Sequence, residues 1–170
     1  EIKVRLLHNE RLNKDLECWI EEAPKGENRK KAAENIKLFL YSKKYDKKPC
    51  LDLSNLGLSS VPDVFASYQF ACMQELNLKG NQLKEVPKEI FGNLKSLQEL
   101  NLEGNQIAGL PEKMFEGLKT LEVLNLKGNR FKEVPKEMFG NLGLRDLDLG
   151  YNQITELPEK IFANLTELQV

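Results

Sequence analysis

Two different hydrophobic patterns divide the chain near residue 50. Upstream of this point, apolar residues recur every three or four positions in two runs, a spacing that places each run on one face of a helix. The runs are Leu12, Leu16, Trp19 and Ile20, then Ala32, Ala33, Ile36, Phe39 and Leu40, separated by Pro24-Lys25-Gly26. Ile2, Val4 and Leu6 alternate instead, which favours a short strand or the frayed start of a helix.

Downstream, one unit is repeated. The stretch 76–83, Leu-Asn-Leu-Lys-Gly-Asn-Gln-Leu, recurs from Leu100, Leu124 and Leu147, and a divergent copy begins at Leu51. Each copy continues with Val-Pro or Leu-Pro and then a Phe. Residues 51–170 therefore resemble the leucine-rich repeat, in about five units of the longer form that ends with Phe. The resemblance implies an α/β solenoid, with short parallel strands on its concave face and irregular or 3-10 segments on its convex face.

The repeated residues of the unit have structural roles. Both leucines of Leu-x-Leu face inward, because side chains alternate across a strand. The asparagine after each strand can bond backbone groups that would otherwise be buried and unpaired. These asparagines are Asn81, Asn105, Asn129 and Asn152, and a stack on the side opposite the strands is expected for Phe65, Phe91, Phe115, Phe139 and Phe162.

Charges alternate between neighbouring units. After each Pro the chain reads Lys88-Glu89, Glu112-Lys113, Lys136-Glu137 and Glu159-Lys160, and the strand side has Lys79, Glu103 and Lys127. Equivalent positions of neighbouring repeats lie side by side, so the alternation predicts unlike charges next to each other. The alternative is the record of a duplicated block of two repeats. Exposed pairs of this kind contribute only about 0–1 kcal/mol each.

Residues 1–50 are expected to form a helical cap over the apolar end of the first repeat. Trp19 is expected in the core of that cap, and Lys43, Lys44, Lys47 and Lys48 in a solvated loop that leads into the repeats. The cap and first unit resemble the IpaH/SspH family at Trp19, Ala23, Gly26-Glu27, Arg29, Ala32 and Ile36, and again from Leu51 to Pro62. Members of that family are bacterial type III secreted effectors with a helical cap, leucine-rich repeats and an E3 ubiquitin ligase domain. Their repeats are shorter and lack the Phe, and residues 1–170 contain no counterpart of the ligase domain.

Composition narrows the class of partner. The chain has 25 basic and 26 acidic residues, a net charge of −1, which argues against a nucleic-acid or anionic-membrane partner. No apolar run approaches the roughly 18 residues of a membrane span, so membrane insertion is not expected. Cys18, Cys50 and Cys72 do not resemble a disulfide-rich cap. We interpret them as reduced, packed thiols, which predicts a reducing environment: the cytoplasm, or a host cytosol reached by bacterial secretion.

Patterns for catalysis, cofactor binding or metal binding are weak. Cys50-Leu51-Asp52 matches the Cys-x-Asp motif of the family's ligase domain, but it falls at the start of the first strand, where Leu51 must point inward. The chain has a single histidine, and no Cys or His pairing has the spacing of a zinc site. The glycines after the strands fit turns rather than a phosphate-binding loop. We therefore expect no enzymatic activity, no cofactor and no metal.

The outward side of the strands remains as the candidate binding surface, because curved solenoids bind partners on their concave face. Its residues are mostly polar and acidic, and two positions break the pattern: Val123 replaces a repeated acid and Tyr151 a repeated glycine. Interface anchors are often aromatic side chains in polar surroundings, so Tyr151 is the leading candidate. The predicted partner-binding residues are Tyr151, Val123, Asp146, Asp148, Lys127, Glu99, Glu103 and Glu75.

Three functions follow from these observations. The first is a non-catalytic protein-binding module, as the target-recognition domain of a bacterial effector. The second is the substrate-recognition fragment of an E3 ubiquitin ligase whose catalytic domain is absent from this chain. The third is a structural repeat protein that self-assembles. Residues 168–170 begin a further repeat without a polar cap, so Leu165, Leu168 and the last strand edge are expected to be exposed and to favour weak self-association.

Overall fold

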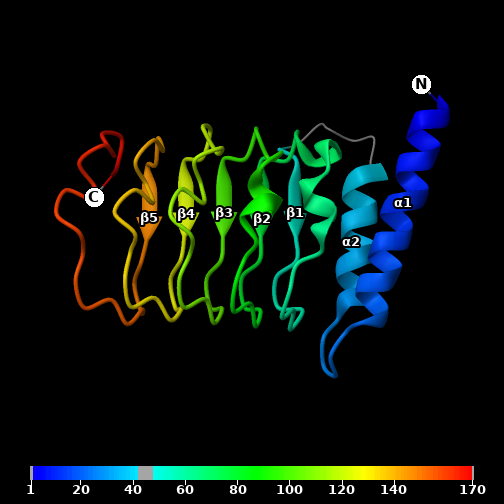
Figure 1. The fold of residues 1–170 in the computed structure, drawn as a ribbon, viewed down its shortest axis with the longest axis horizontal. Helices are drawn as coiled ribbons and strands as arrows, with labels where there is room; N and C mark the ends of the chain where they lie inside the picture. Colours follow the sequence, from blue (N-terminus) through cyan, green and yellow to red (C-terminus); the bar gives the residue numbers. More distant parts are fainter. Residues whose placement is uncertain (1, 42–47, 170) are drawn as a thin grey trace.

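The computed structural model describes residues 2–41 and 48–169. In these residues two helices, α1 (Ile2–Glu21) and α2 (Arg29–Tyr41), precede a five-stranded sheet. Its strands are β1 (Cys50–Asp52), β2 (Glu75–Asn77), β3 (Glu99–Asn101), β4 (Val123–Asn125) and β5 (Asp146–Asp148). The strands are parallel and pair in chain order, so the repeats stack one after another from the helices to the C-terminal end (Figure 1).

Inward leucines hold the sheet to the core. The central residues of the strands are in register, Leu51 with Leu76, then Leu100, Leu124 and Leu147. The first four are at most 2% exposed, and Leu147 in the last strand is partly buried. Their neighbours on either side point outward, because side chains alternate along a strand. The predicted solenoid architecture is confirmed.

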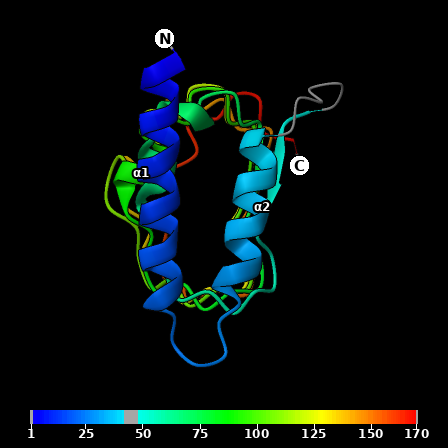
Figure 2. The ribbon, with the colours of Figure 1, turned by 90° about the vertical axis from the view of Figure 1, so that its right-hand side faces the viewer.

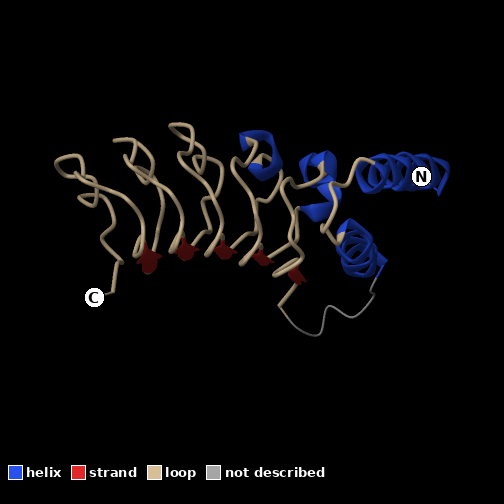
Figure 3. Ribbon diagram, turned by 90° about the horizontal axis from the view of Figure 1, so that it is seen from below, coloured by secondary structure: helices blue, strands red, loops and turns tan. Residues whose placement is uncertain are grey.

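The side opposite the strands contains 3-10 helices and turns. η1 (Asp63–Ala66), η2 (Tyr68–Phe70) and η3 (Lys88–Phe91) belong to the first two repeats, and turns replace them later (Figure 3). η1 and η3 each start directly after the Pro of the repeat, whose ring fixes φ and whose missing N–H leaves no unpaired donor there. Two neighbouring pairs of the predicted Phe stack are in ring contact, Phe91 with Phe115 at 5.7 Å and Phe139 with Phe162 at 6.4 Å between centroids. Four of the five rings are at most 2% exposed, and Phe162 is 38% exposed.

The asparagine ladder forms as predicted. Asn105 is 6% exposed; its Oδ1 accepts the Leu83 N–H at 3.1 Å, and its Nδ2 donates to the carbonyls of Leu78 and Leu102 at 3.0 Å. Asn81 and Asn129 make equivalent bonds and are equally buried. Asn152 repeats the pattern in a half-buried position nearer the end of the solenoid. Each amide therefore pairs backbone groups of two neighbouring repeats.

The two helices lie across the first end of the solenoid, α2 beside β1 and α1 beside η1 (Figure 2). Trp19 is 8% exposed, as expected for a core residue of the cap. The alternation of Ile2, Val4 and Leu6 is part of α1, so the prediction of a short strand or frayed start there is wrong. That segment contains no Gly or Pro, and nothing in it ends the helix that continues through Leu12. Neither helix is long and apolar enough to cross a membrane within the described residues.

A buried polar network joins the cap to the first repeat. Arg29 is 5% exposed; its Nε lies 2.6 Å from Glu27 Oε2, and its Nη1 donates to the Trp19 carbonyl at 2.7 Å. Ser60 Oγ accepts from both Arg29 Nη2 and Trp19 Nε1 at 3.1 Å. Glu27 Oε1 accepts the Ser59 N–H at 3.0 Å. Most of these residues belong to the stretches that resemble the effector family, and they make the junction between helices and repeats.

The prediction of packed cysteines is wrong. Cys18, Cys50 and Cys72 are all exposed free thiols. Their sequence neighbours take the inward positions instead: Leu51 is 2% exposed and Met73 is fully buried. In β1 inward and outward positions alternate, so Cys50, beside the inward Leu51, is turned toward solvent.

The C-terminal end also differs from expectation. Leu165, predicted to be exposed, is 6% exposed, and Leu168 is half-buried. The last turn folds back on the core, and the Gln169 N–H donates to the Arg145 carbonyl at 2.9 Å, as the start of each earlier repeat does. The large apolar side chains exposed at this end are instead Leu157, at 46%, and Phe162.

Candidate functional site

The outward side chains of the sheet form three columns, because equivalent residues of the repeats are in register. The first column is Cys50, Glu75, Glu99, Val123 and Asp146; the second is Asp52, Asn77, Asn101, Asn125 and Asp148. The third follows the strands and comprises Lys79, Glu103, Lys127 and Gly150. These columns, with Lys48 and Tyr151 at their margins, are called the strand face below.

The second column serves the backbone. Asn77, Asn101 and Asn125 each accept, through Oδ1, the N–H of the residue two positions on, at 3.0–3.1 Å. Asp148 accepts the Gly150 N–H in the same way at 2.8 Å. These short side chains hydrogen-bond the backbone of the turn after each strand. Their main role is therefore structural, and contact with a partner is secondary.

Charges near the cap neutralise one another. Lys48 Nζ lies 3.0 Å from Glu75 Oε1 and 2.7 Å from Glu99 Oε1, and Lys79 pairs with Glu103 at 3.0 Å. The hydrogen bond with Glu99 raises the pKa of the Lys48 ammonium, so it stays charged throughout the neutral range. Three predicted binding residues, all glutamates, are therefore engaged within the chain.

Lys48 lies in the exposed loop before β1, as expected, but its two ion pairs were not predicted. Its two carboxylate partners place it on the strand face. The alternation of side chains along a strand could have predicted this position, because Lys48 lies two residues before Cys50 and therefore lies on the same side of the sheet. Lys43, Lys44 and Lys47 of the same lysine run lie outside the described residues.

Five predicted residues come together at the far end of the strand face, and we call them the distal cluster: Val123, Lys127, Asp146, Asp148 and Tyr151. Val123 and Asp146 are in register on neighbouring strands. Lys127 Nζ lies 3.8 Å from Asp148 Oδ2 and 5.2 Å from the centroid of the Tyr151 ring. Tyr151 is 83% exposed, the most exposed large hydrophobic side chain of the described residues.

The backbone at Tyr151 is unusual. Its φ is 54°, in the left-handed region, where Gly80, Gly104 and Gly128 have φ between 65° and 67°. Glycine adopts this conformation without a steric penalty, whereas a side chain with a Cβ is strained there by roughly 1–2 kcal/mol. The turn thus holds the aromatic ring outward at a position where the three preceding repeats carry no side chain.

The charge alternation is realised only in part. Lys79 pairs with Glu103, but Lys127 pairs with Asp148, while Glu103 accepts from Asn125 Nδ2 at 3.2 Å. None of the ion pairs between described residues joins the alternating charges that follow each Pro, although Lys136, Glu137, Glu159 and Lys160 of two neighbouring repeats line the same hollow. The repeats lie further apart on the convex side than at the strands (Figure 3). This favours a duplicated two-repeat block as the origin of the alternation.

Nucleophilic catalysis by the Cys50 thiol is unfavourable. Although Cys50 is an exposed residue, neighbouring atoms desolvate its thiol in part, and this desolvation, followed by the hydrogen bond with Glu75, raises the pKa of Cys50 to about 11. A thiol with this pKa is protonated near neutral pH, and only the thiolate is a good nucleophile. Within the described residues no three His, Cys, Asp or Glu side chains are grouped to hold a metal ion.

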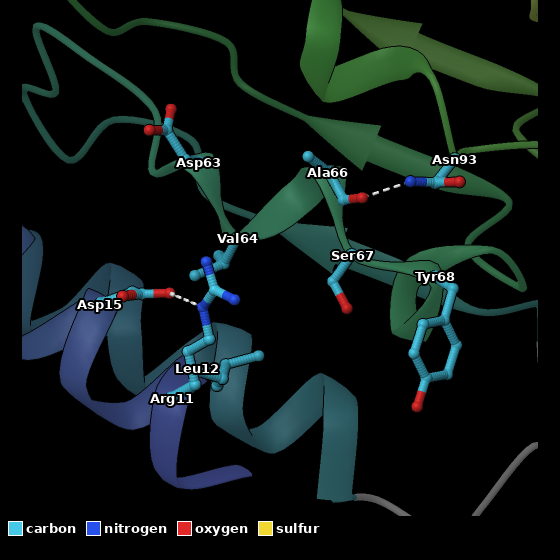
Figure 4. A pocket seen from close by; sticks show the side chains of 9 residues that line it. All are labelled: Arg11, Leu12, Asp15, Asp63, Val64, Ala66, Ser67, Tyr68 and Asn93. Carbon is cyan, nitrogen blue, oxygen red and sulfur yellow. Dashed lines mark hydrogen bonds and ion pairs between the residues drawn. The ribbon is translucent and has the colours of Figure 1, made fainter. Parts of the chain in front are cut away.

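A separate pocket of about 510 Å³ lies away from the strand face, between α1 and the first convex segments (Figure 4). Sequence reasoning gave no indication of it. Arg11 and Asp15 of its lining pair with each other at 3.9 Å, and Asn93 Nδ2 donates to the Ala66 carbonyl. Arg11, Asp15 and Asn93 of this pocket are thus engaged within the chain.

Comparison with known proteins agrees with the fold. The leucine rich repeat family model matches residues 72–131 and 119–170, and the chain belongs to this family. No curated protein matches the chain. A solved structure of a leucine-rich-repeat protein from Leptospira interrogans is similar, with 37% sequence identity and a TM-score of 0.63 over 70% of this chain. This chain spans only 29% of that protein.

Proposed function

We propose that this chain is a non-catalytic protein-binding module and that its partner binds the strand face, with Tyr151 as the main anchor. The observation that carries the proposal is a large aromatic side chain, 83% exposed, on a left-handed backbone that glycine occupies in three other repeats. Strained residues of this kind gather at binding sites, and exposed tyrosines are favoured interface anchors.

The distal cluster supplies the remaining contacts. Val123 adds an apolar surface beside Asp146, and Lys127, Asp146 and Asp148 provide charges that orient a partner. Glu75, Glu99 and Glu103 are already paired, so they form the margin of the surface and contribute less to affinity. Leucine-rich-repeat proteins generally bind other proteins, which agrees with this assignment.

The test is a pull-down from a cytosolic extract with the wild-type chain and with Tyr151→Gly. This variant restores the glycine of the three preceding repeats, so it removes the anchor without disturbing the turn. A partner retained by the wild type should be lost or weakened by about 1–2 kcal/mol with Tyr151→Gly or Val123→Glu. Lys136→Glu on the convex side is the control and should bind normally. Equal binding by both strand-face variants would reject the assignment.

We further propose that the chain recognises targets for a bacterial effector that works in a reducing cytosol. The resemblance of the cap junction to the IpaH/SspH family supports this origin, as does the similarity to a bacterial leucine-rich-repeat protein. Three exposed free thiols fit a compartment that keeps cysteines reduced.

The ligase alternative predicts different chemistry. A fragment with its own catalytic cysteine would form a reductant-sensitive thioester when given a ubiquitin-charged conjugating enzyme. We expect none on Cys50, because its raised pKa keeps the thiol protonated. A thioester on Cys50 would overturn the non-catalytic assignment.

A further inference from the structure

Negative charge is concentrated on the strand face. Its six carboxylates, from Asp52, Glu75, Glu99, Glu103, Asp146 and Asp148, face three lysines, Lys48, Lys79 and Lys127. The face therefore has a net charge of −3, whereas the whole chain has −1. A surface that is more negative than the molecule around it attracts positively charged partners and repels nucleic acid.

The negative charge of the strand face is balanced by lysines near the cap but only in part at the distal cluster. Near the cap, Lys48 bridges two glutamates, and Lys79 pairs with a third. At the distal cluster a single ammonium, that of Lys127, pairs with Asp148. No hydrogen bond or ion pair between described side chains involves Asp146, and it lies in register with the apolar Val123. The uncompensated carboxylate is thus next to Val123 of the distal cluster.

In the unbound chain the ammonium of Lys127 already lies at the distal cluster. Lys127 Nζ is 3.8 Å from a carboxylate oxygen of Asp148 and 5.2 Å from the centroid of the Tyr151 ring. A carboxylate and the face of an aromatic ring together form a favourable environment for an ammonium or guanidinium group. Both contacts of Lys127 are solvent-exposed and long, so they hold the lysine only weakly.

We propose, on the basis of the proposed function, that the protein partner presents a basic side chain, arginine in preference to lysine, to the distal cluster. Its guanidinium bonds the carboxylates of Asp146 and Asp148 and lies against the Tyr151 ring, and an adjacent apolar residue covers Val123. Lys127 occupies this place in the unbound chain and swings aside on binding. Arginine is preferred because its planar group bonds carboxylates in pairs and stacks on aromatic rings.

A selection of random twelve-residue peptides displayed on phage tests the proposal without knowledge of the natural partner. Peptides are selected on the immobilised chain, after those that also bind Tyr151→Gly are removed. The expected survivors carry arginine or lysine beside an aliphatic or aromatic residue. Survivors that are acidic or uncharged would overturn the basic-partner proposal and leave the proposed function standing. Absence of any Tyr151-dependent peptide would count against both.

Titration of a selected peptide then separates two roles of Lys127. If this lysine imitates the partner's cation, Lys127→Gln should tighten binding by roughly two- to fivefold, the range of an exposed ion pair, and Asp148→Asn should weaken it. Lys79→Gln is the matched control, because it removes the same charge two strands away, about 10 Å, where 0.15 M salt screens most of the effect. Weaker binding by Lys127→Gln would overturn the proposal, since the lysine would then be a direct contact.

Discussion

Asparagine and glycine recur in this chain at positions where the backbone needs a hydrogen-bonding side chain or a left-handed φ. The amide of Asn105 pairs three backbone groups, and the glycines after the strands adopt a left-handed φ. Such demands are local and repeat in every unit, so the sequence could predict them. The exposure of Cys72 and the partners of Lys48 depend on neighbouring residues that do not repeat. The packing predicted for Cys72 was therefore wrong, and the ion pairs of Lys48 were not predicted.

Removal of a ladder amide should destabilise the solenoid. Asn105→Ala leaves the buried Leu83 N–H unpaired and removes one of the two amide donors from each of the Leu78 and Leu102 carbonyls, so we expect a loss of about 1–3 kcal/mol in unfolding free energy. Asn152→Ala should lose less, because Asn152 is half-buried and water can replace its bonds. Urea unfolding of the two variants measures this difference, and equal small losses would argue against a buried ladder.

The left-handed backbone at Tyr151 should lower the free energy of unfolding of the chain. Tyr151→Gly relieves the left-handed strain, partly offset by the extra freedom of glycine in the unfolded chain, so we expect a gain of up to about 1 kcal/mol. Gly128→Ala places a Cβ on the equivalent turn and should lose about 1 kcal/mol. Both changes can be read from urea midpoints at a constant slope. A clear loss of stability in Tyr151→Gly would mean that the ring supports the fold.

At the scale of elements, the cap depends on one buried ion pair. Glu27 and Arg29 have side chains only 5–6% exposed, and they link α2 to the first repeat through Ser59 and Ser60. Burial alone would raise the pKa of Glu27, but hydrogen bonds from Ser59 and Arg29 outweigh it, and the pKa is below its ordinary value of 4.5. Folding therefore favours the ionised carboxylate.

The contribution of Glu27 to the stability of the fold should depend on pH. A carboxylate whose pKa is lowered by folding adds stability above its unfolded pKa and loses it as pH falls through the folded value. Glu27→Gln should be less stable than wild type by roughly 1.5–3 kcal/mol at neutral pH, the range for a hydrogen bond to a charged group. That difference should shrink below about pH 4.5. Urea unfolding between pH 3 and 7 measures it, and a difference that grows toward acid would contradict the assigned pKa.

At the scale of the whole molecule, periodicity made the fold predictable. Repeated leucines, asparagines and phenylalanines specify strands, turns and a convex stack, because each unit buries its apolar side against the next. What does not repeat was harder to predict. The pattern identified Val123 and Tyr151 as exceptions, but their grouping with Lys127 and the two aspartates required the register of the strands. Burial of Leu165 required the path of the last turn.

Self-association remains a prediction for this chain, with its surface revised. Leu157 and Phe162, at 46% and 38% exposure, replace Leu165 as the apolar contacts at the C-terminal end. We expect weak, concentration-dependent association in light scattering, reduced by Leu157→Lys and unaffected by Leu38→Lys, a change at an exposed leucine of the cap. A wild-type chain that stays monomeric at millimolar concentration would remove this prediction.

The central claim, that a protein partner binds the strand face at Tyr151, is tested most directly by site-specific photo-crosslinking. Benzoylphenylalanine is placed at Tyr151 on the strand face or at Lys136 on the convex side, and each chain is irradiated in the extract used for the pull-down. The same partner should be linked from position 151 and not from position 136. Crosslinks to that partner from position 136 alone would contradict the account.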